Sequence, residues 1–132
     1  MNNINSVEDA NAWIKKMIPS NIMSVRVKNY GRYGKYYELR SILTVLENVN
    51  DGILYVARSL KKNIDLNKMI TISSLEDANK FIRKIDKSTS FEMCYYQDNI
   101  GAGLILVKTL TRTKNWNELL KDLNYYVSEV TR

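Results

Sequence analysis

The chain has 132 residues, of which 45% are hydrophobic and 26% are charged, proportions that are ordinary for a soluble globular protein. It contains no histidine and a single cysteine, Cys94, which excludes Ser-His-Asp and Cys-His nucleophiles, histidine metal sites and an intramolecular disulfide. Lys and Arg outnumber Asp and Glu by 20 to 14, so the net charge is +6.

No apolar run is long enough to cross a bilayer, and the first residues lack the basic start and apolar segment of a secretory signal. Together with the lone cysteine, these features predict an intracellular, cytoplasmic protein with no membrane partner. The abundance of Asn, Lys, Ile and Tyr is typical of AT-rich genomes, including those of viruses and other mobile elements, but composition does not establish a source.

The first predicted element belongs to a motif that occurs twice. Residues 6–17 read SVEDANAWIKKM and residues 74–85 read SLEDANKFIRKI, sharing Ser, Glu, Asp, Ala, Asn, Ile and Lys at the same places. The opening serine and the aspartate three residues later form a capping-box pattern, and apolar residues then recur at helical spacing. We interpret the motif as an internal duplication in which each copy begins a helix with one buried face.

Further elements lie between and after the two copies. Alternation of apolar and polar residues predicts strands over residues 22–29, 36–46, 68–73 and 91–96. A further strand is predicted over residues 104–113, which is apolar on both sides at its start and should therefore be central in the sheet. Two more helices are predicted, one over about residues 53–60 and one that begins at Asn115. Glycine-containing loops at 29–35 and 97–103 predict that the longer strands pair as two hairpins.

This order predicts an α+β fold. We expect a two-layer sandwich built from a tandem α-β-β-α repeat with pseudo-two-fold symmetry, in which antiparallel hairpins pack on helices. The domain should span residues 1–132, with a first repeat at 1–63 and a second at 68–132. Because each repeat alone is near the size at which a core becomes marginal, we expect the two repeats to share one core.

The first hairpin carries the candidate binding residues, because the two copies differ most there. Basic and aromatic side chains interleave along it: Arg26, Lys28, Tyr30, Arg32, Tyr33, Lys35, Tyr36 and Arg40. The second hairpin has instead a neutral-to-acidic tip at residues 97–99. Cations neutralise phosphates and rings stack on bases, so the first hairpin suits nucleic acid, as do the net charge and a pI near 9.4.

A protein-interaction module is the hypothesis that needs the least special chemistry. Tyr and Arg are favoured in protein interfaces, and an open sheet edge or face can pair with a partner protein or with a second copy. An enzyme is disfavoured, because the glycine clusters resemble turns and Cys94 has no histidine to activate it. We therefore expect a small non-enzymatic adaptor or inhibitor without cofactor or metal, with nucleic-acid binding as the alternative.

Overall fold

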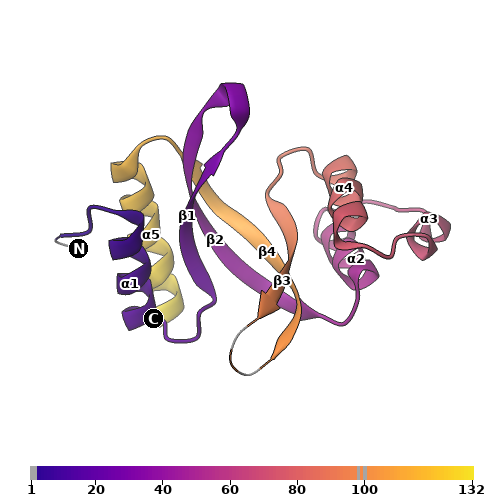
Figure 1. Cartoon of the computed structure of the whole chain (residues 1–132), viewed down its shortest axis with the longest axis horizontal. Helices are drawn as coiled ribbons and strands as arrows, with labels where there is room; N and C mark the ends of the chain where they lie inside the picture. Colours follow the sequence, from indigo (N-terminus) through magenta and orange to yellow (C-terminus); the bar gives the residue numbers. More distant parts are fainter. Residues whose placement is uncertain (1–2, 98, 100) are drawn as a thin grey trace. The chain divides into compact units, whose positions relative to one another are not determined.

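The computed structural model describes residues 3–97, 99 and 101–132. In this part of the chain the fold is mixed α+β, with five α-helices and a four-stranded sheet in the order β1-β2-β4-β3 (Figure 1). The elements are α1 Val7–Met17, β1 Met23–Asn29, β2 Lys35–Leu46, α2 Val49–Ser59, α3 Leu66–Ile70, α4 Leu75–Ile85, β3 Phe91–Gln97, β4 Ala102–Thr113 and α5 Trp116–Thr131.

Both predicted hairpins are present, and both are antiparallel. β1 pairs with β2 in a register that places Arg26 opposite Glu38 and Val27 opposite Tyr37. β3 pairs with β4 in the same way. The prediction that β4 is a central strand is confirmed, since it lies between β2 and β3 in the sheet order.

The loop of the first hairpin is a 3-10 turn, Gly31–Tyr33, closed by a 2.9 Å hydrogen bond from the Tyr30 amide to the Gly34 carbonyl. Gly34 has φ 88° and ψ −167°, a backbone conformation that is essentially restricted to glycine. This position of the loop therefore requires glycine. The expected loop at 97–103 includes residues 98 and 100, which lie outside the described residues.

The duplicated motif begins a helix in both places, as predicted. The Ser6 hydroxyl accepts a 3.1 Å hydrogen bond from the Asp9 amide at the start of α1, and Ser74 accepts the equivalent bond from Asp77 at the start of α4. Asn115 caps α5, also as predicted. Each cap satisfies backbone donors that a helix start leaves unpaired.

The prediction of a strand over residues 68–73 is wrong, because a short helix, α3, occupies the first part of this segment. The Asp65 side chain accepts a 3.0 Å hydrogen bond from the Asn67 amide and so begins the helix. Met69 is buried whereas Ile70 is 76% exposed. The alternating apolar residues here do not mark the two faces of a strand.

The chain divides into two compact units. Unit 1 consists of Met1–Ser41 and Thr109–Arg132, and unit 2 consists of Ile42–Lys108. The boundaries fall inside β2 and inside β4. Each unit thus takes residues from both of the repeats predicted at 1–63 and 68–132, and the duplication itself stays a prediction.

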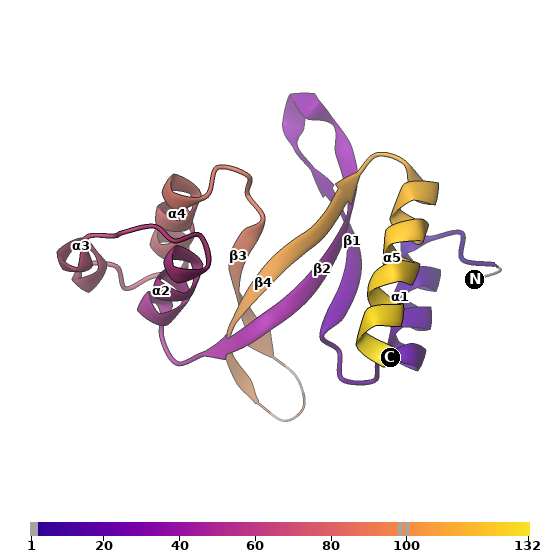
Figure 2. The ribbon, with the colours of Figure 1, turned by 180° about the vertical axis from the view of Figure 1, so that it is seen from behind.

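Each unit has its own hydrophobic core. In unit 1, α1 and α5 lie side by side, as both views of the chain show (Figures 1 and 2). They bury residues that include Ile14, Val25, Leu39, Leu119, Leu123 and Val127. In unit 2, α2 and α4 lie side by side around a second cluster that includes Ile53, Val56, Ile82, Met93 and Leu106. The described residues therefore form two buried clusters and not the single shared core that we expected.

Candidate functional site

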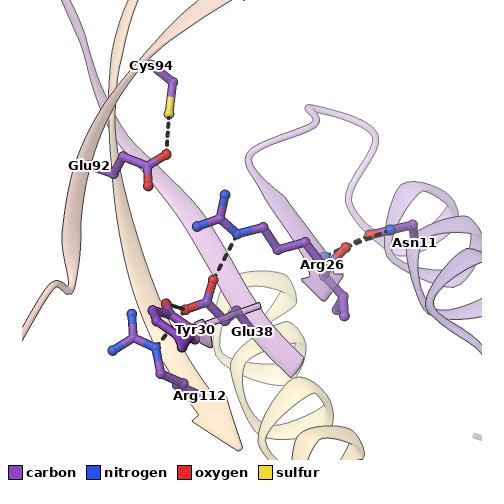
Figure 3. A network of polar contacts seen from close by, with 8 residues as sticks. Asn11, Arg26, Tyr30, Glu38, Glu92, Cys94 and Arg112 are labelled. Carbon is purple, nitrogen blue, oxygen red and sulfur yellow. Dashed lines mark hydrogen bonds and ion pairs between the residues drawn. The ribbon is translucent and has the colours of Figure 1, made fainter. Parts of the chain in front are cut away.

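A buried carboxylate lies at the centre of the first hairpin. Glu38 comes immediately before Leu39, whose side chain lies in the core of unit 1. Because successive side chains of a strand point to opposite faces, the Glu38 side chain lies on the face of β2 opposite this core. Glu38 nevertheless has 0% of its surface exposed. It accepts hydrogen bonds from Arg26 Nε at 2.8 Å, from Arg112 Nε at 2.7 Å and from the Tyr30 hydroxyl (Figure 3).

Burial and hydrogen bonding together set the pKa values of Glu38 and Tyr30, the two acids of the network. Burial alone would raise the pKa of Glu38, but the hydrogen bonds from Tyr30, Arg112 and Arg26 outweigh it and hold the pKa below its ordinary value of 4.5. Burial, together with the hydrogen bond to Glu38, raises the pKa of Tyr30 to about 12. At neutral pH the network is therefore an ionised carboxylate with a neutral phenol and two guanidinium groups.

This arrangement suits the positioning of cations better than proton transfer. A general base needs a pKa near the working pH and an available lone pair. Glu38 has a lowered pKa and is surrounded by three donors. Tyr30 is a poorer acid than an ordinary tyrosine. The side chains of Arg26 and Arg112 remain 30% and 24% exposed, so the carboxylate fixes two cations that still reach the surface.

Two lysines and two rings extend the network. The Lys28 ammonium lies 5.4 Å from the centre of the Tyr30 ring, and the Arg112 guanidinium lies 4.9 Å from it. The Tyr30 and Tyr36 rings meet edge to face at 5.6 Å. Lys114 lies 5.0 Å from the centre of the Tyr36 ring. We call this group the Glu38 cluster and define it as Arg26, Lys28, Tyr30, Tyr36, Glu38, Arg112 and Lys114.

The structure brings together four of the eight predicted binding residues. Those in the Glu38 cluster are Arg26, Lys28, Tyr30 and Tyr36. Arg32 and Tyr33 contact each other in the exposed loop, where Arg32 donates a 2.9 Å hydrogen bond to the Tyr33 hydroxyl. Lys35 is exposed at the first position of β2, and Arg40 lies two residues beyond Glu38, opposite Ser24.

Sequence reasoning missed the other members of the cluster: Glu38, Arg112 and Lys114. A signal for Glu38 was present, because Arg26 and Glu38 are equally distant from the centre of the loop and carry opposite charges. No local signal links Arg112 to this site, since it is 74 residues from Glu38 in the sequence.

The repeated asparagine of the duplicated motif was also left without a role. Asn11 of α1 bonds to both backbone groups of Val25: its amide nitrogen donates to the carbonyl at 2.9 Å, and its oxygen accepts from the N–H at 2.8 Å. Asn79 of α4 makes the same two bonds with Met93 of β3. β1 and β3 are the edge strands of the sheet, so each asparagine covers part of an open edge.

A shallow groove of about 690 Å³ lies beside β1 in unit 1. We call it the β1 groove and define it by its lining residues: Asn5, Ser6, Val7, Glu8, Val25, Arg26, Val27, Tyr37 and Trp116. The Tyr37 and Trp116 rings meet at 4.9 Å, and the Trp116 indole donates a 3.1 Å hydrogen bond to the Ile4 carbonyl. The aromatic wall of the groove is therefore held in place.

Other chemistry is sparse in the described part of the chain. The Cys94 thiol donates a 3.2 Å hydrogen bond to Glu92 in unit 2. Residues 3–97, 99 and 101–132 include no group of three or more Cys, Asp or Glu side chains placed to hold a metal ion. Within the same ranges, none of the helices has the length and apolar character needed to span a membrane.

Comparison with known proteins identifies no relative: no protein-family model, no curated protein and no solved structure matches the chain.

Proposed function

We propose that this chain is a non-enzymatic binding protein whose first hairpin recognises an acidic surface of a partner protein. The observation that carries the proposal is the Glu38 cluster, in which two guanidinium groups bond to one buried carboxylate and two lysines lie over the neighbouring Tyr30 and Tyr36 rings. The excess of positive charge attracts acidic groups, and the hydrogen bonds to Glu38 fix two of the cations before a partner arrives. Because Arg26 and Arg112 are already held in place, binding costs less conformational entropy.

The rings of the cluster favour a protein partner over a nucleic acid. Binding to single strands relies on aromatic faces on which bases stack. Two cations already lie over the Tyr30 ring, its hydroxyl is bonded to Glu38, and its edge contact engages Tyr36. Tyr33 is 59% exposed, but the Arg32 guanidinium lies 5.0 Å from the centre of its ring.

Nucleic acid remains the second candidate, because the same cations would contact phosphates. The net charge of +6 supports this alternative. The two candidates differ in their expected dependence on salt. Counterion release from nucleic acid gives affinity that falls linearly on a log–log plot against salt concentration.

The test is fluorescence anisotropy with three labelled probes: a glutamate-rich peptide, single-stranded DNA and single-stranded RNA. The variant Lys28→Glu with Lys114→Glu should weaken peptide binding about tenfold or more, equivalent to at least about 1.4 kcal/mol. The matched control is Lys87→Glu with Lys121→Glu, which changes the net charge equally at exposed lysines outside the cluster. Equal loss in both variants would contradict the proposal, and binding to nucleic acid alone would establish the alternative.

A further inference from the structure

We propose that the edge of β1 at Val27 and Asn29 binds an extended segment of the acidic partner by strand addition. The segment would alternate apolar and acidic residues. This inference rests on the proposed function and specifies how the partner is held. Three features of unit 1 carry it: the hydrogen-bonding direction of β1, the β1 groove on one face of the strand, and the Glu38 cluster on the other face.

The backbone of β1 offers hydrogen bonds at its edge. Because both backbone groups of Val25 bond to Asn11, they point away from β2. The direction alternates along an antiparallel strand, so the N–H and C=O groups of Val27 and Asn29 point the same way as those of Val25. Asn11 covers the edge only at Val25, and in the described structure nothing bonds to the edge groups of Val27. An added strand would satisfy these groups.

One face of the added strand would meet apolar side chains. Val27 is 46% exposed and lines the β1 groove with Tyr37 and Trp116. The lining also includes Glu8 and Arg26, whose charges are opposite, so charge does not select the residues of the partner on this face. Contact with the exposed Val27 side chain and the two rings favours apolar residues of the partner there.

The opposite face of the added strand would meet cations. Successive side chains of a strand point to opposite faces, so Arg26 and Lys28 lie on the face that carries the Glu38 cluster. Acidic residues of the partner on this face would complement them. Alternation of apolar and acidic residues is thus required by the two faces together, and neither face alone would demand it.

A second copy of this chain is a poorer occupant. Pairing β1 with the β1 of another copy would bring Arg26 and Lys28 close to the same two cations.

The edge of β3 in unit 2 provides a comparison. Asn79 covers this edge at Met93 as Asn11 covers β1 at Val25, and Tyr95 occupies the position that Val27 has in β1. Cys94 and Tyr96 occupy the positions that Arg26 and Lys28 have in β1, and Glu92 adds a negative charge on the same face, which makes β3 the matched control for β1.

The experiment uses a labelled eight-residue peptide in which valine and glutamate alternate, with two N-methylated versions. In an antiparallel addition the valine N–H groups face β1, and in a parallel addition the glutamate N–H groups face it. We expect methylation of one set to weaken binding about tenfold or more and methylation of the other set to change it little. Equal affinity of the two methylated peptides would overturn the inference, because neither set of N–H groups would then face a strand.

Protein variants provide a second measurement. Val27→Pro removes an edge N–H that β2 does not use, and it should weaken binding, whereas Tyr95→Pro should not. If the charge-reversed variant Lys28→Glu with Lys114→Glu loses affinity while both methylated peptides bind alike, the proposed function stands and strand addition fails. If the peptide does not bind at all, both fail. A dimer in light scattering that Val27→Pro abolishes would identify a second copy as the occupant and overturn the inference.

Discussion

Replacement of Glu38 by glutamine tests how much the Glu38 cluster contributes to the stability of unit 1. Glu38→Gln keeps the shape of the side chain but removes the charge that faces Arg26 and Arg112. Loss of one partner from a buried ion pair typically costs about 3–5 kcal/mol. Water still reaches the two guanidinium groups, which are 30% and 24% exposed, and glutamine retains one acceptor oxygen. We therefore expect the free energy of unfolding to fall by about 2–4 kcal/mol.

Urea unfolding followed by tryptophan fluorescence is a suitable assay. Trp13 and Trp116 are the two tryptophans of the chain, and both belong to unit 1. Their emission therefore reports on the unit that contains Glu38. Glu129→Gln is the control, because Glu129 is an exposed residue of unit 1 whose ion pair with Arg132 lies at the surface, and its replacement should change stability by less than about 0.5 kcal/mol. A loss below about 1 kcal/mol for Glu38→Gln would refute the reasoning that the carboxylate organises these cations.

Three further predictions concern the same hairpin and its edge. The pKa of Tyr30 is raised to about 12, so its stabilising contribution is complete below its ordinary pKa of 10.0 and is lost as the pH rises towards 12. The difference in unfolding free energy between wild type and Tyr30→Phe should accordingly stay constant up to about pH 10 and then shrink; a flat difference through pH 12 would contradict the assignment. Asn11→Ala removes two part-buried hydrogen bonds and should lower the stability measured by tryptophan fluorescence by about 1–3 kcal/mol. Asn79→Ala, in unit 2, should change the stability measured by this signal less. Arg32→Glu with Lys35→Glu should weaken binding of the glutamate-rich peptide and leave the thermal midpoint nearly unchanged, because both side chains are exposed; unaltered affinity would remove the loop from the binding surface.

Local features of the fold could be predicted from the sequence because they depend on neighbouring residues. The serine and asparagine caps, the two hairpins and the central position of β4 each have a short-range signal. α3 was mistaken for a strand because an apolar alternation of a few residues does not distinguish a half-buried strand from a helical turn.

Features that depend on distant contacts could not be predicted. The division into two cores depends on which helices pack together, and neither the α1–α5 pair nor the α2–α4 pair is encoded by local periodicity. Arg112 reaches Glu38 across 74 residues of sequence. The role of Asn11 could be predicted only in part. The identical asparagine in both copies of the motif was visible in the sequence, but the strand to which it bonds was not.

The measurement that tests the account most directly is the affinity of the labelled glutamate-rich peptide for wild type and for Glu38→Gln at one salt concentration, under conditions where tryptophan emission shows both to be folded. The substitution makes the protein more positive while it releases Arg26 and Arg112 from their shared acceptor. If the organised cations recognise the partner, Glu38→Gln should bind the peptide more weakly despite its extra positive charge. Tighter binding by Glu38→Gln would show that net charge alone governs the interaction, and would contradict the account.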